Sequence, residues 1–462
     1  MLQCLTLKGK HTMKSSFKQV NSQKNTKRSN YYIPIKMKFW LSHLFSLIWM
    51  CLSIYLALPW LKDLTEVVSF QVAILFIAGI SYLPGYMNAF LIMSLILDRQ
   101  PHFKNDKPTD AITILIAAHN EEDKIFQTLR YIDNQDYTGN IKTIVINNRS
   151  SDQTVNEVLK AKEDLKLEIV LLQEEKPGKF HALNKALNFV ETSYVITIDA
   201  DTLLHPSSIR FLVARMNSSS EEVCAVAGSV LTKNSRDNLL TKMQEWDYFL
   251  GIASIKRLQG LYQGTLVAQG AYSLYKTKCL KEIGGWPDAI GEDIVLTWRL
   301  LQKHWKVYFE PLAVSFTEVP SSFKHFVRQR ARWARGMVEG LKEIKPWQQP
   351  QLYVKYLTGI NFIMPYLDLT YTLCWIPGLI LACFGNFIIV GPMTLLVLPL
   401  TLISYSILYF YQRNYVFKRL QLRIRKNFVG FILFILFYQM IMSPVSVYGY
   451  MQELFKLKRN WK

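Results

Sequence analysis

The sequence predicts an α/β domain with a doubly wound sheet, inserted between transmembrane helices. Long stretches without charge lie toward both ends of the 462-residue chain, while charged residues concentrate in the middle. The middle region alternates short apolar runs with amphipathic segments, the pattern of buried parallel strands and their connecting helices. Polar clusters follow several of the apolar runs, at the strand ends where such sheets bind ligands.

The uncharged stretches are long enough to cross a membrane. One runs from residue 39 to 60 and a second from residue 67 to 97, and each exceeds the roughly 20 helical residues that span a bilayer. After the middle region, residues 357–411 are uncharged except for Asp368, and a further apolar stretch covers residues 428–450. We expect two transmembrane helices before the middle region and two or three after it. An ionisable residue at membrane depth is usually functional, which makes Asp368 a candidate for lining a path across the membrane.

The positive charge is distributed as in a membrane protein. The net charge is +19, and the chain before residue 39 carries basic residues and no acidic one. Residues 413–426 form a second basic segment between apolar stretches. Basic residues beside spans mark the cytoplasmic side, so we expect a multi-pass protein of the cell membrane with its middle region in the cytoplasm. The lipid bilayer is then the partner of these basic segments, and nucleic acid is not.

The predicted organisation follows from these boundaries. The basic C-terminal tail also belongs inside, which favours four full spans plus one re-entrant or interfacial segment. In chain order we expect a basic disordered arm (1–38), two transmembrane helices (39–97), a cytoplasmic α/β domain (98–317), an interfacial amphipathic segment (318–356), two to three transmembrane helices (357–452) and a basic tail (453–462). The expected strands are 112–118, 143–146, 168–172, 194–198 and 223–226, and the expected helices include 121–134 and 179–190.

Asp199 and Asp201 straddle Ala200 directly after one expected strand. Their spacing lets two carboxylates converge on one hard cation, Mg²⁺ or Mn²⁺, whose other ligands are water and phosphate oxygens. Two acidic residues near a strand end are also common in turns and helix caps. No GxGxxG motif follows any expected strand, which removes support for a nicotinamide or flavin cofactor.

Two further motifs carry chemistry. Glu292 and Asp293 follow a Gly-Gly-Trp-Pro loop, and one of these carboxylates can act as a general base toward a hydroxyl group. The alternative is a helix cap or an acidic first turn. The sequence Gln-Arg-Ala-Arg-Trp at 329–333 lies in an amphipathic segment, where a Trp beside Arg suits a sugar ring and a phosphate. Its alternative role is a basic membrane anchor.

The ordered set Asp-x-Asp, Gly-Gly-Trp, Glu-Asp and Gln-Arg-x-Arg-Trp resembles the membrane-bound processive synthases of glycosyltransferase family 2. This family includes cellulose, hyaluronan, chitin-oligosaccharide and poly-β-1,6-N-acetylglucosamine synthases, and the motifs cover about residues 112–336. The resemblance implies a domain of the GT-A type, a divalent cation, a UDP-sugar donor and inverting transfer to a growing polysaccharide. N-acetylglucosamine is the first sugar we expect.

The resemblance also implies roles for individual residues. Asp293 is the expected base with Glu292 beside it, and the metal ligands are Asp199 and Asp201. The donor-binding residues are His119, Asn120, Glu121, Asn148, Lys179, Asp199, Gln329, Arg330 and Arg332, and the acceptor-binding residues are Trp333, Gly285 and Trp286.

The chain departs from the family pattern at a few of these positions. Asn148 stands where the family usually has Asp, and Arg149 where it usually has Gly. Gly291 replaces the common Thr before Glu-Asp, and His119 replaces a usual Tyr. An Asn oxygen can still accept a hydrogen bond from a uracil N–H.

Two other functions compete with polysaccharide synthesis. One is transfer of a single sugar to a lipid acceptor by a related enzyme. The other is a catalytically silent membrane protein that senses nucleotide sugars or forms a scaffold for an export complex with partner subunits. Measuring product length distinguishes the first alternative from polysaccharide synthesis. Measuring UDP release distinguishes the second.

Overall fold

The computed structural model describes residues 33–99, 101–390 and 397–457. Most of the expected basic arm, residues 1–32, and tail residues 458–462 lie outside the described residues. The first helix begins at Ile35, so the end of the expected arm is helical.

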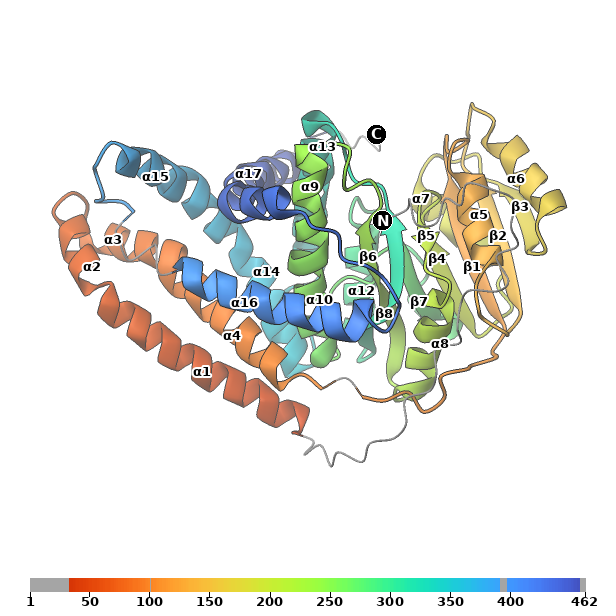
Figure 1. Ribbon diagram of the computed structural model, residues 1–462, viewed down its shortest axis with the longest axis horizontal. Helices are drawn as coiled ribbons and strands as arrows, with labels where there is room; N and C mark the ends of the chain where they lie inside the picture. Colours follow the sequence, from red (N-terminus) through yellow and green to blue (C-terminus); the bar gives the residue numbers. More distant parts are fainter. Residues whose placement is uncertain (1–32, 100, 391–396, 458–462) are drawn as a thin grey trace.

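One eight-stranded mixed sheet with the order β3-β2-β1-β4-β7-β6-β8-β5 forms the middle of the chain (Figure 1). The strands are β1 (Ile112–Ala118), β2 (Ile141–Asn147), β3 (Glu168–Gln173), β4 (Tyr194–Ile198), β5 (Leu203–Leu204), β6 (Val223–Thr232), β7 (Tyr272–Lys276) and β8 (Lys306–Thr317). The expected α/β fold is therefore confirmed, and all five predicted strands are present.

The helices before and within the sheet domain are α1 (Ile35–Leu56), α2 (Leu58–Thr65), α3 (Phe70–Ile77), α4 (Leu83–Leu97), α5 (Ile125–Asp133), α6 (Thr154–Asp164), α7 (Lys179–Leu187), α8 (Ser208–Ser218), α9 (Leu239–Trp246), α10 (Ala253–Leu261), α11 (Thr277–Glu282) and α12 (Glu292–Gln302). They are followed by α13 (Phe323–Glu343), α14 (Leu352–Thr370), α15 (Ile376–Cys383), α16 (Val397–Tyr411) and α17 (Phe428–Leu454). Short π-helical or 3₁₀ segments are η2 (Ala78–Tyr82), η3 (Asp247–Ile252), η4 (Pro346–Gln348), η5 (Tyr371–Trp375) and η7 (Gln412–Phe417).

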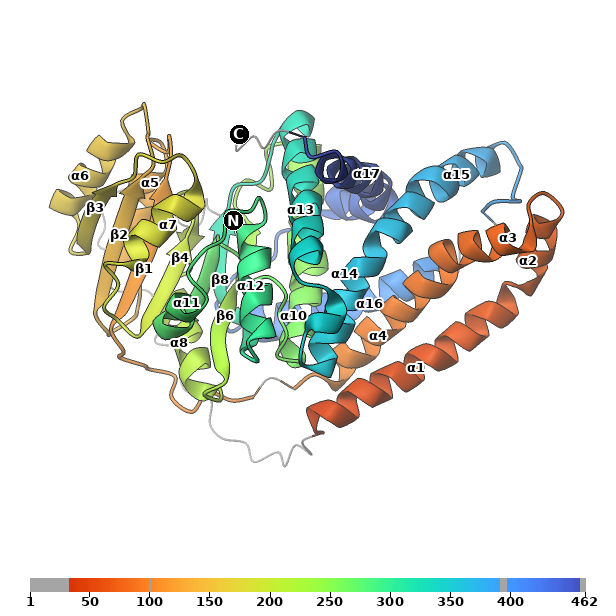
Figure 2. The same ribbon diagram turned by 180° about the vertical axis from the view of Figure 1, so that it is seen from behind.

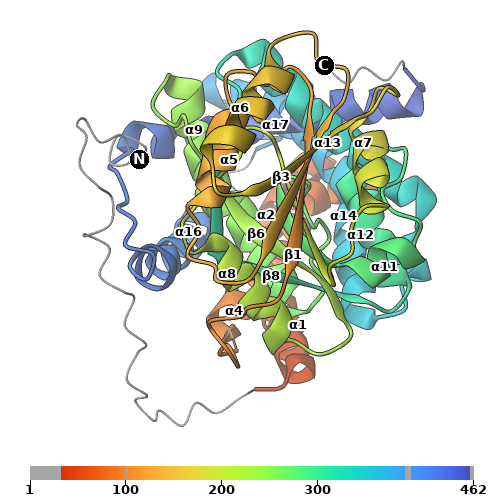
Figure 3. The ribbon, with the colours of Figure 1, turned by 90° about the vertical axis from the view of Figure 1, so that its right-hand side faces the viewer.

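The central strand β1 shows why these residues form a covered sheet. Ile114 and Ile116 belong to one buried cluster and Leu115 to another, because successive side chains of a strand point to opposite faces. Helices cover both faces: Figure 3 shows α5 and α8 on one side of the sheet and α7, α11 and α12 on the other. Apolar side chains in every position of such a strand are buried, which explains the continuous apolar run that predicts it.

The second half of the sheet differs from the predicted doubly wound pattern. The four strands β3, β2, β1 and β4 are parallel, but β7 lies antiparallel between β4 and β6. Every residue of β7 is buried. The sequence of a short strand does not reveal its direction, because the alternation of side chains between the two faces is the same in parallel and antiparallel strands.

Four helices in the described part of the chain are long and apolar enough to cross a membrane. They are Ile35–Leu56, Phe70–Leu97, Leu352–Cys383 and Phe428–Leu454. Large apolar side chains on these helices face outward, with Ile48 61% and Leu373 66% exposed. Figures 1 and 2 show the helices gathered on one side of the sheet domain, away from the β3 edge.

Helix α13 connects the sheet domain to the last apolar helix. It packs along α17, where Arg335 Nε donates to Glu453 Oε2 at 2.8 Å and Lys342 Nζ donates to Glu453 Oε1 at 2.8 Å. A Cβ at Gly449 would meet the Ala331 backbone oxygen at 2.4 Å, so the two helices approach closely there. This contact positions the Gln-Arg-Ala-Arg-Trp motif beside the apolar helices.

Candidate active site

The Lys179 ammonium joins the acidic residues of two motifs. Its Nζ lies 2.5 Å from Asp199 Oδ1 and 3.6 Å from Glu292 Oε1. Asp199 follows the end of β4, while Lys179 and Glu292 are the first residues of α7 and α12. The fold therefore brings the Asp-x-Asp and Glu-Asp motifs together at the carboxyl end of the parallel strands, although 91 positions separate Asp201 and Glu292 in the sequence.

Gly270 completes this cluster from the loop before β7. Its backbone N–H donates to Asp293 Oδ2 at 3.4 Å. A Cβ at this position would lie 2.7 Å from Lys179 Nζ and 3.5 Å from Glu292 Oε1. A side chain at this position would therefore displace the end of the Lys179 side chain from its place beside the carboxylates. Sequence reasoning missed Gly270, which is an isolated glycine outside any motif.

Burial and charge set the electrostatics of the cluster. Burial raises the pKa of Glu292, the Lys179 charge opposes this rise and the neighbouring Asp293 adds to it. Burial alone would lower the pKa of Lys179, but Asp199 and Glu292 raise the pKa above its usual value. The lysine is therefore charged, and it offsets part of the repulsion among the carboxylates that surround it.

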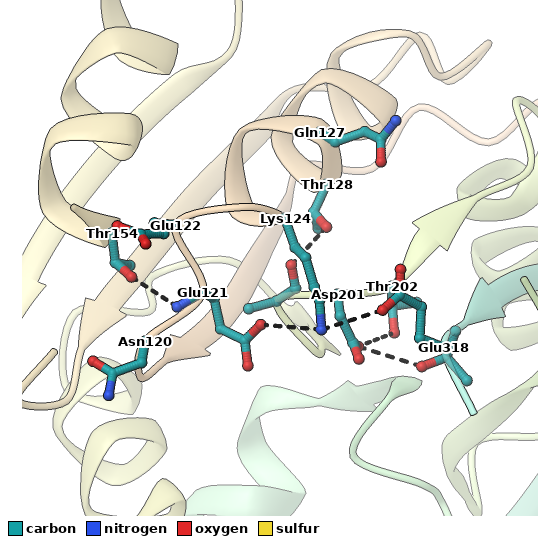
Figure 4. Close-up of polar contacts among 12 residues, drawn as sticks. Asn120, Glu121, Glu122, Lys124, Gln127, Thr128, Thr154, Asp201, Thr202 and Glu318 are labelled. Carbon is teal, nitrogen blue, oxygen red and sulfur yellow. Dashed lines mark hydrogen bonds and ion pairs between the residues drawn. The ribbon is translucent and has the colours of Figure 1, made fainter. Parts of the chain in front are cut away.

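Asp201 lies in a second group of charged residues on the other side of the Asp-x-Asp motif. Lys124 Nζ lies 3.7 Å from Glu121 Oε2 and 3.3 Å from Glu318 Oε2, and Figure 4 shows Asp201 beside this chain of charges. Thr317 Oγ1 donates to Asp201 Oδ1 at 3.3 Å. Burial, with the charge of Asp199, raises the pKa of Asp201 to about 6.

The acidic pair fits a divalent cation that takes most of its ligands from elsewhere. Asp199 and Asp201 are close enough for one charge to raise the pKa of the other, and a cation would relieve that repulsion. Within the described residues, no group of three or more His, Cys, Asp or Glu side chains could hold a metal ion. Two carboxylates leave coordination positions for water and phosphate oxygens, as Mg²⁺ prefers.

The residues expected to hold the nucleotide lie after β1 and β2. His119 Nδ1 lies 2.7 Å from the Asn148 backbone oxygen. Asn120 has a positive φ of 56°, its N–H donates to Ser150 Oγ at 3.0 Å, and the Glu121 N–H donates to Thr154 Oγ1 at 2.8 Å. The two loops are thus tied to each other at the edge where ligands bind in parallel sheets.

The Asn148 side chain holds the loop that leads to Lys179. Its Nδ2 donates to the backbone oxygens of Glu174 and Lys176 at 3.0 and 2.6 Å, and its Oδ1 accepts from the Gly178 N–H at 2.8 Å. Asn148 is buried, and in this structure its amide oxygen serves the protein backbone. An aspartate could not donate the two Nδ2 hydrogen bonds, which explains why asparagine suits this position.

The Gln-Arg-Ala-Arg-Trp motif separates into two faces of α13. Arg332 and Trp333 are exposed, and Arg332 lies close enough to act electrostatically on Glu292. The Gln329 Oε1 is buried and has no hydrogen-bond partner among the described residues. These three side chains are available to a ligand.

The resemblance implies that Arg330 faces the diphosphate, but the structure buries its side chain against Asp247. It is 2% exposed, its Nη2 donates to Asp247 Oδ2 at 2.8 Å, and its guanidinium stacks 4.0 Å from the centroid of the Trp333 ring. Arg330 therefore ties α13 to η3 and supports Trp333 from behind. The reason is helical geometry: positions two residues apart on a helix point about 200° apart, so Arg330 and Arg332 face opposite sides of α13.

Gly285 and Trp286 are expected to contact the acceptor, but both are buried in the structure. The Trp286 ring is 2% exposed and packs edge-on against Tyr275. Its backbone is held by Asn184, which accepts from the Trp286 N–H at 2.8 Å and donates to its carbonyl oxygen at 2.8 Å. Gly285 has a φ of +79°, which permits this turn. The structure gives this loop a packing role under the Glu-Asp motif.

Gly291 allows α12 to approach α13. A Cβ on Gly291 would lie 2.7 Å from the Gly336 Cα. Glu339 Oε2 on α13 accepts hydrogen bonds from the Ile290 and Gly291 N–H groups at 2.7 and 3.2 Å. Gly291, in place of the usual threonine, thus faces another glycine, Gly336, on α13. The close approach of the two helices brings Glu292 near Arg332.

Sequence reasoning missed a buried lysine beside the expected base. Lys256 Nζ on α10 donates to the Val267 carbonyl oxygen at 2.9 Å and also to Gln269 Oε1. Burial lowers the pKa of Lys256 to about 8, and the charge of Asp293 acts in the opposite direction. No motif marks Lys256, because its partners come from a loop that precedes β7.

The fold and the converging motifs define a GT-A-like glycosyltransferase. Residues 108–336 match the family described as "Glycosyltransferase like family 2", so this part of the chain is a family 2 glycosyltransferase domain.

Relatives and a solved structure agree with this assignment. The chain is 32% identical over 241 residues to a poly-β-1,6-N-acetyl-D-glucosamine synthase of Staphylococcus aureus, a match that covers 52% of this chain and 57% of that protein. It is 26% identical over 336 residues to the synthase of Staphylococcus epidermidis, covering 72% of this chain and 78% of that protein. A mannosyltransferase from Pyrobaculum calidifontis, solved with GDP-mannose and Mn²⁺, has a similar fold with a TM-score of 0.58 at 18% identity, covering 84% of this chain and 99% of that chain.

Proposed function

We propose that the protein is an inverting glycosyltransferase that adds sugar from a UDP-sugar to a growing β-linked polysaccharide. The observation that carries this proposal is the convergence of Asp199, Lys179, Glu292 and Asp293 around Gly270. A leaving diphosphate needs positive charge, and an attacking hydroxyl needs a base. The cluster offers both kinds of group at one strand edge.

In the proposed mechanism, Asp293 accepts the proton of the acceptor hydroxyl. That oxygen forms a bond to the anomeric carbon as the bond from this carbon to the diphosphate breaks, with inversion. Lys179 and Arg332 supply positive charge where the diphosphate departs, and Trp333 offers its exposed ring to the acceptor sugar. Gly270 orients Asp293 through its N–H.

The proposed cofactor is Mg²⁺ or Mn²⁺, held by Asp199 and Asp201. When bound, the cation would neutralise charge on the departing diphosphate. The mannosyltransferase of similar fold was solved with Mn²⁺. Thr317 and the pairing of Lys124 with Glu121 and Glu318 hold the surroundings of Asp201 in place.

N-acetylglucosamine is the proposed sugar, and export through the apolar helices is the proposed fate of the product. The names of the staphylococcal relatives support the sugar, although the chain spans 57% of the length of the S. aureus protein. The position of α13 along α17 supports export, because it places Trp333 beside the apolar helices. We further propose that the sheet domain faces the cytoplasm, where UDP-sugars are made.

The test is UDP release by the purified full chain in proteoliposomes, across a panel of UDP-sugars. We expect release with UDP-N-acetylglucosamine and a product of many sugars. Release accompanied only by single-sugar lipid products would favour the lipid-acceptor alternative. No release with any donor, from protein that unfolds cooperatively on heating, would favour a silent sensor or scaffold.

A further inference from the structure

A cavity of about 430 Å³ lies outside the carboxylate site, where α4, α10 and α16 meet. Figure 1 shows α4 in the apolar bundle with α16 alongside it, and α10 on the side of the sheet domain. The proposed glycosyl transfer makes no use of this cavity. Its lining combines apolar and charged side chains, which is unusual for a packing defect.

The two kinds of lining are separated along the helices. The lining includes Leu95, Ile407 and Leu408, which we call the apolar wall, and Asp98, Arg99 and Arg257, which we call the charged wall. Helix α4 ends at Leu97 and helix α16 at Tyr411, and charged residues follow both ends. If these helices lie in a bilayer, as the proposed function requires, the charged wall stands at the level of the lipid headgroups.

The charged wall carries an excess of positive charge. Asp98 Oδ2 accepts from Arg257 Nε at 2.5 Å. Among the described residues, the Arg99 guanidinium donates to the backbone oxygens of Ile96 and Asp98, at 3.3 and 3.0 Å. Lys38, near the cavity, lies close enough to Asp98 and Arg99 to interact electrostatically with both. Two arginines, Arg99 and Arg257, thus line the cavity with one carboxylate, Asp98, so the charged wall favours an anion.

Tyr411 provides a second, independent indication of a ligand. Its hydroxyl is buried and has no hydrogen-bond partner among the described residues, although its residue lines the cavity. The Arg257 guanidinium lies 2.9 Å from the centroid of the Tyr411 ring, which holds the ring in place. A buried hydroxyl without a partner costs free energy unless something binds it.

We propose that this cavity binds one anionic phospholipid, with its phosphate held by Arg99 and the Tyr411 hydroxyl and an acyl chain against Leu95, Ile407 and Leu408. Arginine is suited to phosphate because its planar donors match two oxygens. A zwitterionic lipid would bring a second cation toward Arg257 and bind less well. The site is therefore selective for an anionic headgroup.

The lipid would touch the helix that leads to the active site. Arg257 is adjacent on α10 to Lys256, whose Nζ donates to Val267 and Gln269 in the loop before Gly270. Arg257 thereby connects the cavity to the loop that contacts Asp293. This consequence rests on the proposed function, whereas lipid binding itself can be measured without turnover.

The experiment counts lipids retained by the purified full chain in detergent, using native mass spectrometry with phosphatidylglycerol or phosphatidylcholine added. We expect one phosphatidylglycerol retained in preference to phosphatidylcholine. Arg99→Gln should reduce retention about fivefold, the effect of one basic residue at a lipid surface. The matched control is Arg423→Gln, an exposed arginine outside the cavity, which should leave retention unchanged. Ile407→Trp should reduce retention by filling the apolar wall.

Three results would overturn the proposal. Equal retention of both lipids would remove the headgroup selectivity. Equal loss in Arg99→Gln and Arg423→Gln would indicate general attraction to a basic surface. Displacement of the lipid by millimolar inorganic phosphate, with Ile407→Trp binding lipid normally, would indicate a free phosphate site. Melting temperatures of the variants identify any loss caused by misfolding, and UDP release tests the enzyme separately.

Discussion

Single residues in the site owe their properties to neighbours from distant parts of the chain. Lys179 meets Asp199 and Glu292 because β4, α7 and α12 all present an end at the same edge of the sheet. Asp201 carries a raised pKa because it is buried near Asp199. We therefore expect substitutions in the Asp-x-Asp motif and in the Glu-Asp motif to have different effects.

Asp201→Asn is expected to abolish turnover. It removes one of the two carboxylates proposed to hold the cation, and loss of an outer-shell partner alone typically costs about 10- to 100-fold in metal affinity. The measurement is UDP release as a function of Mn²⁺ concentration. Asp164→Asn, an exposed acid at the end of α6, is the control. Near-normal turnover of Asp201→Asn, or full activity after chelation, would contradict the metal assignment.

Asp293→Asn is expected to lose transfer and keep donor binding. Removal of a general base typically lowers the rate about 10²- to 10⁴-fold, while the donor contacts proposed for Lys179 and Arg332 stay intact. The measurements are UDP release and calorimetric binding of UDP. Asp288→Asn, an exposed neighbour, should retain both. If Asp293→Asn lost UDP binding together with transfer, the residue would have a structural role at the start of α12.

Close contacts position the helices relative to one another and to the sheet domain. Helices α12 and α13 touch through Gly291 and Gly336, and α13 is held to α17 by Glu453. The basic segment after η7 is held to the sheet domain by His205 Nε2, which lies 3.2 Å from the Leu420 backbone oxygen. Two of these contacts, that of Gly291 with Gly336 and that of His205 with Leu420, are tested by the substitutions below.

Gly291→Thr is expected to destabilise the protein by about 1–3 kcal/mol, the usual cost of overpacking, and to reduce turnover. Its Cβ would lie 2.7 Å from the Gly336 Cα, so α12 must move and take Glu292 and Asp293 with it. Thermal unfolding and UDP release measure the two effects. Gly359→Ala is the control, because a Cβ there meets nothing within 4 Å. Unchanged stability of Gly291→Thr would show that the helices can separate freely.

Stability is expected to fall as the pH decreases from about 6.5 to 4. Burial lowers the pKa of His205 to about 4. Its Nε2–H donates to Leu420 while its Nδ1 accepts from the Ser207 N–H, at 3.3 Å, an arrangement that only the neutral ring permits. The unfolded state therefore binds the proton first, and stability is lost at about 1.4 kcal/mol per pH unit within this window.

The measurement compares melting temperatures of the wild type and His205→Gln across this pH range. Glutamine stays neutral and can still donate to the Leu420 oxygen. We expect a weaker pH dependence in the variant, because it lacks the imidazole. The carboxylates that titrate in the same range are present in both proteins and therefore do not contribute to the difference. Identical profiles would mean that His205 is protonated as easily in the folded state as in the unfolded state.

At the scale of the whole molecule, the site and the apolar helices meet at α13. Trp333 is 37% exposed on the helix that packs against α17. Within the bundle, Asp368 accepts hydrogen bonds from Ser443 at 2.9 Å and from Tyr450 at 2.7 Å. Asp368 therefore joins α14 to α17. Its expected role in lining a product path stays a proposal.

Trp333→Ala is expected to shorten or abolish polymer while donor binding persists. A polymer made on the donor side must cross the bilayer along a shielded path, because sugar hydroxyls cannot shed water into hydrocarbon. Product length and the side of reconstituted vesicles on which product accumulates are the measurements. Trp347→Ala, a tryptophan 64% exposed outside the motif, is the control. Product confined to the donor side would contradict export through the bundle.

The local sequence pattern alone predicted many of the strands, helices and candidate site residues of this protein. The strands at 112–118 and 194–198 and the long apolar helices were predictable, because hydrophobic periodicity and length are properties of short segments. The same reasoning found Asp199, Asp201, Glu292 and Asp293, since these residues sit in motifs with fixed spacing. It also grouped Arg330 with Arg332, as neighbours in one motif.

Only the tertiary structure decided which of these residues meet. It buried Arg330 and exposed Arg332, inserted β7 antiparallel beside β4, and brought Lys179 and Gly270 to the carboxylates. Each outcome depends on how helices and strands distant in sequence pack against each other. Such contacts leave no periodic trace within any one segment, so the positions of single glycines and lysines became informative only in the folded molecule.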